Sequence, residues 1–541
     1  MPSVARKIEP IHTDIRNVDS TYEATASVTP ELVIALCGPI GSPLHETATQ
    51  IQSTLNDFNY TTELIKLSDL IRLNVKLSEV PVNDTSRYFE IDSLIRGGDA
   101  LREKFGNDIL AKMAIAKISG DRVKEYGEFI DIAAEKEVPK SNKIKSQRIC
   151  HVIDSVKNYD ELKLLRTIYG DALFAIGVFS PLEVRQKNLE HTEEIIESDI
   201  KKLIDTDSGE EFSHGQSVRD TFPQCDFFLR VDEAIKGPSA SKAKAKIVES
   251  LSTLFKLIFR TDVISPTLQE NAMYAAASAA RNSACLSRQV GAAVTSENGE
   301  LLATGWNDVP NSGGGLYGKP ALNGTLNADL RCHAQKGAKC HNDTEKKAIA
   351  EMIVEGLITS AVMAKTKKAK AIETIISNTR LKDLIEFSRA VHAEMHSILS
   401  ASRVAGERIV GGKIFVTTYP CHACARHIIA AGLKEVYYIE PYRKSLATRL
   451  HSDAMTEATS DSNNLVKIIQ YDGVAPRRFL DLFESTSRKA KGGMLKLSEP
   501  KEAVPVTNVS LRAIPRLEQV VAAEVSSKSL LLPELKPPRN E

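Results

Sequence analysis

Continuous apolar runs alternate with helical patterns along the first half of the chain. The segment ELVIALCGPIGSPLHETATQIQSTL, residues 31–55, predicts an apolar strand, a glycine-proline turn and a helix. Further apolar runs predict buried strands at residues 148–156, 172–180 and 225–233, and residues 160–170 between the first two predict a helix. Buried strands that alternate with helices are typical of a parallel sheet with helices on both faces. The first half of the chain is therefore expected to be an α/β domain.

A second α/β pattern with a different order begins near residue 262. Small residues dominate a helical stretch at 271–284, and QVGAAVTSENGELLATGWN, residues 289–307, predicts a β-hairpin. The turn of this hairpin is Glu-Asn-Gly, a combination that tight turns favour. The strands KIFVTTYP and KEVYYIEP then flank the helix CHACARHIIAAGL.

Composition shifts suggest where the domains begin and end. We expect a flexible arm at 1–29, an α/β domain at 30–250, a second domain at 262–480 with a long insert at about 311–388, and a C-terminal tail at 481–541. The arm lacks a sustained period, and the tail is polar and rich in proline, which is typical of a mobile segment or a partner-binding arm. A length of 541 residues is enough for two or three domains with buried cores.

Charge and hydropathy narrow the class of protein. Lys+Arg and Asp+Glu both number 70, so the net charge is zero. Proteins that track nucleic-acid backbones usually carry excess positive charge, so the balance favours a small-molecule substrate. No stretch approaches the roughly 20 apolar residues of a membrane helix, and the start lacks the apolar run of a signal peptide. We expect a cytoplasmic protein without membrane contact, in which the eight cysteines are thiols and metal ligands rather than disulfides.

Three side chains have the types and spacing of a catalytic zinc site. His392 begins the motif His-Ala-Glu, and Cys421 and Cys424 form a C-x-x-C pair after Pro420, at an expected helix start. Zinc prefers thiolate and imidazole ligands, and the helix dipole and backbone N–H groups there favour thiolates. Three protein ligands leave a fourth position for water, the arrangement of catalytic zinc. The alternative, two buried thiols and a surface histidine, does not account for the combination of motifs.

Glu394 is the candidate proton shuttle of this site. It follows His392 by two residues, so it can face a zinc-bound water, whose pKa falls towards about 7, without binding the metal. From there it can carry the released proton to a ring nitrogen and to leaving ammonia. The pattern H-x-E…P-C-x-x-C is similar to the signature of zinc-dependent nucleobase deaminases. The nearby His396, His422 and His427 are expected to be surface or packing residues.

Segments around this motif resemble the deoxycytidylate deaminases. They are RNSACLSRQVGAAVTSENGELLATGWNDVP, VHAEMHSIL and IFVTTYPCHACARHIIAAGLKEVYYIEPY. The zinc motif is common to cytidine-deaminase-like proteins, whereas R-x-V-G-A-x-V at 288–294 and T-G-x-N-x-x-P at 304–310 point to the deoxycytidylate branch. The resemblance covers about residues 262–480. It implies a cytidine-deaminase-like α/β/α domain with a central five-stranded sheet, and substrate contacts at Asn307 and around Ala393.

With a kinase-like domain before it, the whole chain resembles the anti-phage dCTP and dCMP deaminases of bacteria. The resemblance implies zinc-dependent hydrolysis of dCTP, dCMP or both to dUTP or dUMP and ammonia, which would deplete the dCTP pool during infection. It also implies a homo-oligomer, and it makes an inhibitory RNA or a phage-derived trigger a candidate partner. No residue spacing bears on these partners or on the choice between dCMP and dCTP.

The insert carries a second set of candidate zinc ligands in RCHAQKGAKCH, residues 331–341. Some deoxycytidylate deaminases hold a second, structural zinc, with one ligand on the helix before the R-x-V-G-A strand, where this chain has Cys285. The resemblance thus implies a closed site made by Cys285, Cys332, Cys340 and either His333 or His341. The alternative is a loop whose cysteines bind nothing.

GPIGSPLH, residues 38–45, follows a strand and opens a helix, as a phosphate-binding loop does. It resembles the P-loop of nucleoside and nucleotide kinases, which implies a P-loop kinase-like fold for 30–250. Against G-x-x-x-x-G-K-[ST], however, Pro43, Leu44 and His45 replace the second glycine, the lysine and the Ser/Thr. Phosphoryl transfer is therefore not expected.

Two interpretations of this domain remain, a nucleotide sensor and a structural relic. Gly38, Gly41 and Ser42 still allow a nest of backbone amides that can bind an anion. In the sensor, a regulatory nucleotide bound without rapid hydrolysis would set the deaminase activity.

Two rival functions are less consistent with the residues. A polynucleotide cytidine or adenosine deaminase needs a basic groove with aromatic side chains. The chain has one Trp, at 306, and its lysine clusters at 241–246 and 365–370 lack interleaved aromatics. A nucleotide-binding switch or kinase built on the first domain would lack the phosphate-binding lysine.

Overall fold

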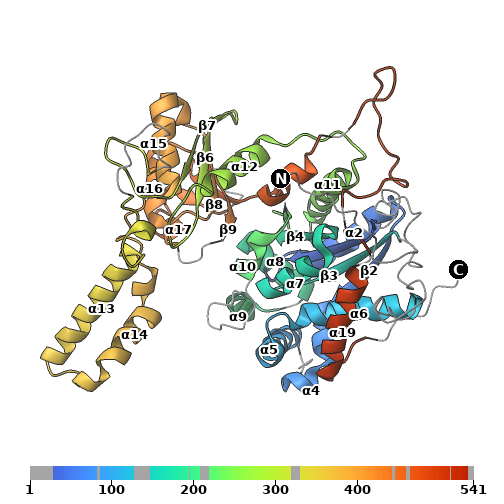
Figure 1. Ribbon diagram of the computed structural model, residues 1–541, viewed down its shortest axis with the longest axis horizontal. Coiled ribbons are helices and arrows are strands. Elements are labelled where there is room, and N and C mark those ends of the chain that lie inside the picture. The colour runs from blue at the N-terminus through green and yellow to red at the C-terminus, as the bar shows by residue number, and fades with distance from the viewer. Residues whose placement is uncertain are drawn as a thin grey trace, which may run out of the picture. The chain divides into compact units, whose positions relative to one another are not determined.

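The computed structural model describes residues 28–81, 86–126, 147–193, 195–207, 218–317, 329–441, 445–458, 464–485, 487–507, 509–511 and 513–533. The chain forms two compact units, Met1–Ile264 with Ser485–Glu541, and Ser265–Glu484 (Figure 1). Residues 1–27 of the expected arm lie outside the described residues. Among the helices described, none is both long and apolar enough to cross a membrane. Both units are α/β with mostly parallel sheets, which confirms the predicted fold class at that level.

The strands of the first unit pair in parallel. They are β1 (Leu32–Cys37), β2 (Thr61–Lys66), β3 (Ile149–Asp154), β4 (Leu173–Phe179) and β5 (Phe227–Arg230). Their order, β5-β4-β1-β3-β2, places β1 at the centre, and all of its residues are buried. The strands predicted at 148–156, 172–180 and 225–233 are confirmed. Because each parallel strand must be reached by a crossover, the carboxyl ends of these strands share one edge of the sheet.

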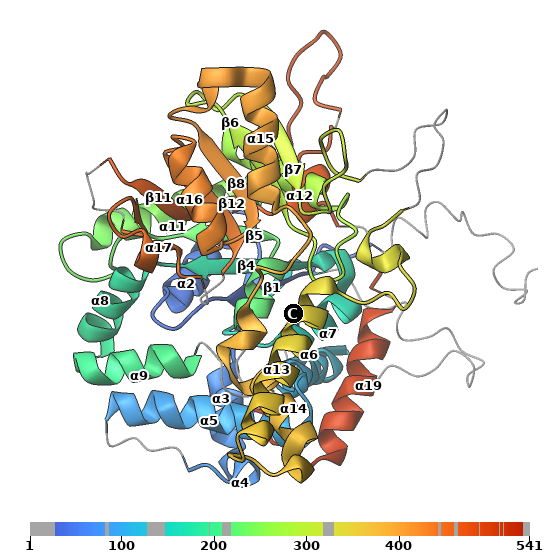
Figure 2. The same cartoon turned by 90° about the vertical axis from the view of Figure 1, so that its left-hand side faces the viewer.

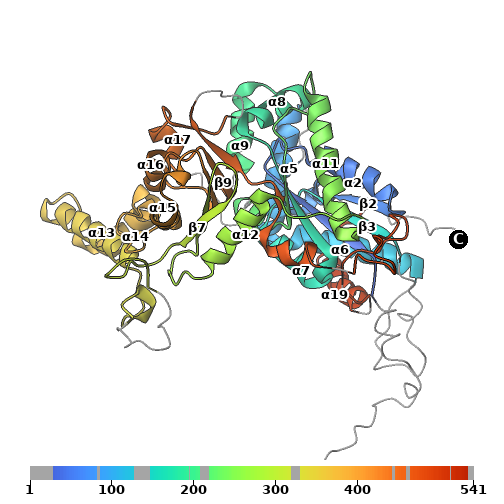
Figure 3. The ribbon, with the colours of Figure 1, turned by 90° about the horizontal axis from the view of Figure 1, so that it is seen from above.

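Helices cover both faces of this sheet (Figure 3). On one face α2 (Leu44–Asn56) packs against α11 (Ala240–Phe259), and on the other α6 (Ile109–Tyr126) packs against α7 (Tyr159–Tyr169). The remaining helices of the unit were not singled out by the hydrophobic pattern: α3 (Leu67–Leu73), α4 (Val75–Ser78), α5 (Arg87–Phe105), α8 (Leu182–Glu193), α9 (Glu197–Asp207) and α10 (Val218–Thr221).

Part of the tail at 481–541, which was expected to be a mobile segment or a partner-binding arm, forms a packed helix. Residues Ile514–Ser527 form helix α19, which packs along α6 and belongs to the first unit (Figure 1). Glu518 on this helix is fully buried and accepts a hydrogen bond from Arg122 Nε at 2.8 Å, and Arg122 also pairs with Glu31. Removing one partner of such a buried pair leaves an uncompensated charge. The helical spacing of Ile514, Val521 and Val525 was masked by the polar, proline-rich composition around it.

The sheet of the second unit has the order β10-β11-β9-β8-β6-β7. Its strands are β6 (Gly291–Thr295), β7 (Leu301–Trp306), β8 (Lys413–Thr418), β9 (Glu435–Glu440), β10 (Met455–Thr456) and β11 (Val466–Gln470). The predicted hairpin is confirmed, since β6 is antiparallel to β7, and β6 is also antiparallel to β8. The strands from β8 to β10 are parallel. The sheet exceeds the implied five strands by β10, which has only two residues and lies at the edge.

Two glycines let helices approach both faces of this sheet closely. Helix α12 (Leu268–Ala280) lies over β6, where a Cβ on Gly291 would be 1.9 Å from the Ala276 carbonyl oxygen. Helix α15 (Ala393–Ala405) lies over β7, where a Cβ on Gly305 would be 2.6 Å from the Ala393 carbonyl oxygen. Because Ala393 is the first residue of α15, this contact sets the height of the helix start above the sheet.

The long insert of the second unit contains a helical hairpin. Helix α13 (His341–Thr359) packs against α14 (Lys368–Asn378), and the pair projects away from the sheet of its unit (Figures 1 and 2). Cys340 directly precedes α13, and Cys332 lies in a short 3-10 helix before it, Cys332–Ala334.

Candidate active site

Two helix starts bring three zinc-type ligands together. His392 directly precedes α15, and Cys421 directly precedes α16 (His422–Ala430), which carries Cys424 in its first turn. The His392 Nδ1 lies 3.4 Å from the Cys421 Sγ and 3.2 Å from the Cys424 Sγ. Within the described part of the chain, this is the only group of three or more His, Cys, Asp or Glu residues whose ligand atoms all lie within 4.8 Å of one another.

Local structure explains why the C-x-x-C pair faces the histidine. Strand β8 runs beside β9, and the Tyr419 N–H still donates to the Glu440 carbonyl at 2.8 Å. Pro420 has no N–H with which to continue the ladder, so the chain leaves the sheet there. The helix that follows places residues three apart on one side, which turns Cys424 toward the side of Cys421.

The two thiols cannot both ionise easily without a cation. The pKa of Cys421 is lowered to about 4 by its hydrogen bonds with Cys424 and then with His392. The pKa of Cys424 is raised well above its usual value by its hydrogen bond with Cys421 and by burial. The same contact with Cys421 raises the pKa of His392 to about 9. Zinc binds thiolate sulfur and neutral imidazole, and its charge offsets the repulsion between two thiolates, so this donor set fits zinc.

Glu394 lies in the first turn of α15 beside the three ligands. Its side chain is buried, with 4% of the residue exposed. Burial, and then the charge of Cys421, raise the pKa of Glu394 to about 7. A carboxyl group with a pKa near neutrality can both accept and donate a proton.

The predicted substrate contacts lie at the end of β7 and the start of α15. Asn307 follows β7, and its side chain already holds the preceding loop: its Oδ1 accepts from the Val290 N–H at 2.7 Å, and its Nδ2 donates to the Arg288 carbonyl at 2.9 Å. An amide side chain has two donors and two lone pairs, so one donor and one lone pair of Asn307 remain beyond these contacts. Ala393 is fully buried.

Sequence reasoning missed Asp308, which anchors this end of β7. It is almost fully buried and accepts hydrogen bonds from the Ala284 N–H at 3.2 Å and from its neighbour Val309 at 2.8 Å. It also pairs with Arg331 Nη1 at 3.1 Å, which ties the insert to the end of the strand. The sequence contained a signal for Asp308, because this acidic residue directly follows Asn307 inside the T-G-x-N-x-x-P motif.

The other histidines near the motif have packing partners instead of a place among the ligands. The Trp306 N–H donates to His396 Nδ1 at 3.2 Å, and burial lowers the pKa of that imidazole. His427 Nδ1 contacts the Ala423 carbonyl at 2.7 Å, and His422 lies 3.7 Å from Glu386.

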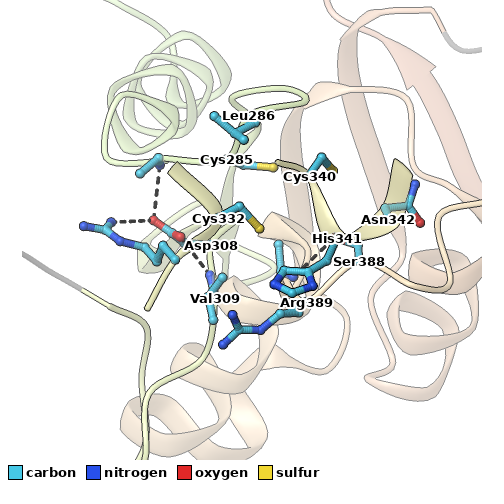
Figure 4. Close-up of a pocket in the computed structure, with 13 residues that line it drawn as sticks. Cys285, Leu286, Asp308, Val309, Cys332, Cys340, His341, Asn342, Ser388 and Arg389 are labelled. Carbon is cyan, nitrogen blue, oxygen red and sulfur yellow. Dashed lines mark hydrogen bonds and ion pairs between the residues drawn. The ribbon is translucent and has the colours of Figure 1, made fainter. Parts of the chain in front are cut away.

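The insert cysteines and Cys285 lie around a small pocket. Cys285, Cys332, Cys340 and His341 line a cavity of about 20 Å³, whereas His333 is not part of its lining (Figure 4). This volume holds roughly one water-sized particle. The His341 Nε2 lies 3.2 Å from Gln335 Oε1. The structure therefore brings four of the five candidates to one pocket, although without the tight spacing of the first group.

The phosphate-loop-like residues lie between β1 and α2 in the first unit. A Cβ on Gly38 would be 2.2 Å from the Val178 carbonyl oxygen, and Gly41 has a φ of +81° beside Arg185. The Ser42 N–H donates to the Pro39 carbonyl at 3.1 Å. These glycines thus have packing roles in the loop, and its nucleotide-binding role stays a prediction.

Comparison with known proteins matches the second unit. Residues 266–440 match the model of the cytidine and deoxycytidylate deaminase zinc-binding region. The deoxycytidylate deaminase of Enterobacteria phage T2 is 30% identical over 165 residues, which are 30% of this chain and 76% of that protein. That of Enterobacteria phage T4 is 30% identical over 165 residues, 30% of this chain and 74% of that protein. A crystal structure of dCMP deaminase from the cyanophage S-TIM5, in complex with dCMP and dUMP, is 20% identical with a TM-score of 0.21, and covers 38% of this chain and 99% of that one.

Proposed function

The chain belongs to the cytidine and deoxycytidylate deaminase family, and from this premise we propose that it hydrolyses the amino group of a free deoxycytidine nucleotide. His392, Cys421 and Cys424 form the zinc site typical of that family. The proposed reaction converts dCMP, dCTP or both, with one water, to dUMP or dUTP and ammonia. The relatives at 30% identity are deoxycytidylate deaminases, which supports the deoxynucleotide over a nucleoside.

The buried carboxyl group of Glu394 beside the three ligands is the observation that carries this proposal. Zinc, when bound, acidifies the water that supplies the hydrolytic oxygen. Glu394 accepts a proton from that water and delivers it to N3 of the cytosine ring. It then helps to move the second proton to the departing amino group, so that the C4–N bond breaks and ammonia leaves.

The proposed position of the nucleotide is based on the residues around the zinc ligands. In this proposal the free donor and lone pair of Asn307 meet the sugar or the base, and the backbone around Ala393 meets the base. Asp308 has a positioning role, because its contacts with Ala284 and Arg331 hold the end of β7 in place.

A substrate panel tests the proposed function. Purified full-length protein is incubated separately with dCMP, dCTP, single-stranded DNA and RNA, and ammonia and the uracil product are measured. We expect turnover of a free nucleotide and none of either polymer, and the relative rates for dCMP and dCTP decide between them. Deamination of a polymer without deamination of either nucleotide would contradict the proposal and favour a polynucleotide deaminase.

We further propose that the reaction depletes the dCTP pool during phage infection. This proposal rests on the resemblance of the whole chain to the anti-phage deaminases. That resemblance includes the kinase-like fold expected for the first unit. We therefore expect the dCTP concentration to fall in infected cells that carry the wild-type chain. It should not fall in infected cells that carry the Glu394→Ala chain.

The pocket at the insert cysteines supports a proposal of a second, structural zinc held by Cys285, Cys332, Cys340 and His341. Three cysteines and a histidine make a closed tetrahedral zinc site. The four residues line one cavity, and a bound ion would draw their ligand atoms together. Arg331 is adjacent to Cys332 and pairs with Asp308. An ion bound at Cys332 would therefore also help to fix the end of β7.

Replacing His341 by alanine should lower the zinc content from about two to about one per chain, because one of the four ligands is lost. The matched control is His333→Ala, which lies outside the pocket lining and should keep both ions. Zinc is measured by elemental analysis of the purified proteins. A wild-type content near one per chain that Cys332→Ser and Cys340→Ser leave unchanged would contradict the second site.

A further inference from the structure

A cavity of about 520 Å³ lies within the first unit, at the carboxyl edge of its sheet. Its lining comes from the loop after β1, the ends of β2 and β3, and helices that include α3, α5 and α8. Open parallel sheets bind ligands outside the carboxyl ends of strands, at the point where the chain continues to opposite sides. Strand β1 occupies that point, because β3 and β2 lie on one side of it and β4 and β5 on the other. The volume is within the range of roughly 300–1,000 Å³ found for small-molecule sites.

Part of the cavity lining is apolar, although Arg72, Arg87 and Arg102 also line the cavity from the same helices α3 and α5. The apolar part is formed by Ile71 of α3, by Ile91, Leu94 and Ile95 of α5, and by Leu110 of α6. An aliphatic slot of this kind favours a flat ring without charge, because the ring removes apolar surface from water on both sides.

The other end of the cavity is polar. The Ser42 Oγ is buried there without a hydrogen-bond partner among the described residues. Asp154, at the end of β3, is also buried and accepts from Ser155 Oγ at 3.1 Å. Burial raises the pKa of Asp154, and the charges of His45, Lys66 and Lys157 oppose that rise. Polar groups from the loop after β1 and from the ends of β2 and β3 therefore meet at one place.

Among the cations that line the cavity, Lys66 is the one most available to a ligand. Arg72 and Arg87 both pair with Glu90, and Arg102 pairs with a buried glutamate on α7. Lys157 donates to the Gly38 carbonyl at 2.8 Å. Lys66 forms no hydrogen bond or ion pair of its own within the described residues, and Asp154 is the acid whose charge it offsets.

The loop after β1 is engaged by the protein itself. The N–H groups of Ser42 and Leu44 donate to the carbonyls of Pro39 and Ser42, at 3.1 and 2.8 Å. Asn188 of α8 donates to the Gly41 carbonyl at 2.9 Å, which holds the loop in this conformation. The amides of Ser42 and Leu44 are thus in use and cannot also donate to a polyphosphate chain, so the side chains at the strand ends are the better candidates to meet an anion.

We propose that this cavity binds a nucleoside monophosphate, with its base in the slot between α3 and α5 and its phosphate at Lys66 and Ser42. The carboxylate of Asp154, which lies at the same polar end, accepts a hydrogen bond from a sugar hydroxyl. The expected nucleotide contact was the backbone amides of Gly38, Gly41 and Ser42, whereas this site uses the side chains of Ser42, Lys66 and Asp154. It lies within the first unit, so it does not depend on the proposed deaminase function.

Calorimetric titration of the full-length Glu394→Ala chain tests this site, because that variant does not consume deoxycytidine nucleotides. The probes are dAMP, dTMP, inorganic phosphate and dATP. We expect a monophosphate to bind, phosphate alone to bind at least tenfold more weakly, and dATP to bind no more tightly than dAMP. Lys66→Met should weaken monophosphate binding roughly tenfold or more, since charge-assisted hydrogen bonds to a phosphate are lost. Leu94→Trp should block the slot and abolish binding.

Matched variants separate this site from a loss of folding and from the zinc site. Lys163→Met changes an exposed lysine outside the lining, and Leu182→Trp changes an exposed leucine outside it; both should bind like the parent chain. All variants are checked by thermal unfolding. The proposal is overturned if no monophosphate binds below about 1 mM, or if phosphate alone binds equally well. It is also overturned if Lys66→Met and Leu94→Trp, both folded, bind like the parent, or if dATP binds tenfold more tightly than dAMP.

Discussion

Replacing Glu394 by alanine will lower the turnover of a deoxycytidine nucleotide by at least roughly 10²–10⁴-fold, the usual worth of one general acid–base group. The loss should reach or exceed the upper end, because in the proposed reaction one carboxyl group serves both proton transfers. Zinc should stay bound, since His392, Cys421 and Cys424 are unchanged. The Glu394→Gln chain keeps the shape of the side chain and should lose the same activity. The measurements are turnover number, zinc content and thermal unfolding.

The control for this result is Glu297→Ala, which removes an exposed glutamate that pairs with Lys434 at the surface of the same unit. Exposed pairs of this kind contribute little to stability, so turnover and zinc content should both match the wild type. If the Glu394→Ala chain keeps near wild-type turnover, the assigned role of Glu394 is wrong even if the zinc site stands.

Exchanging Cys421 and Cys424 together for alanine will remove about one zinc per chain and all measurable deamination. The double variant leaves His392 as the single protein ligand, and one imidazole cannot hold zinc in competition with water and buffer. Elemental analysis gives the zinc content, and the substrate panel gives the activity.

The control for the cysteine exchange is Cys150→Ala in β3, a buried thiol of the first unit. It should keep its full zinc content and its activity. The double variant should still show the unfolding transition of the first unit, which contains neither cysteine. Unchanged zinc together with unchanged activity in the double variant would refute the assignment of these ligands.

The zinc site could be predicted because its chemistry depends on short-range spacing. A histidine directly before one helix, and cysteines three residues apart at the start of another, point in directions set by the helix itself. Glu394 likewise follows from its distance of two residues to His392. What the motif could not show is how the two helix starts meet. That contact depends on Gly305, where any side chain would collide with the backbone of α15.

Long-range contacts account for the expectations that changed. The composition of residues 481–541 predicts a mobile tail, yet Glu518 pairs with Arg122, 396 positions earlier in the chain. No local pattern records such a partner. Asn307 was expected to contact substrate, and its amide also holds the loop at Arg288 and Val290. A motif identifies a residue type at a position, whereas its hydrogen-bond partners come from the fold.

By itself, the sequence determined the α/β character of both halves, the central strands and the zinc ligands, and it led to the proposal that Glu394 is their acid–base partner. These features depend on side-chain period and local spacing, which the linear chain contains directly. Only the tertiary structure decided that the insert cysteines share one pocket and that helix α19 packs along α6 in the first unit. It also decided that Lys66, Asp154 and Ser42 line the same cavity as the aliphatic side chains of α3 and α5. Lys66, Asp154 and Ser42 come from separate strand ends, and only the assembly of the parallel sheet brings them to the same edge.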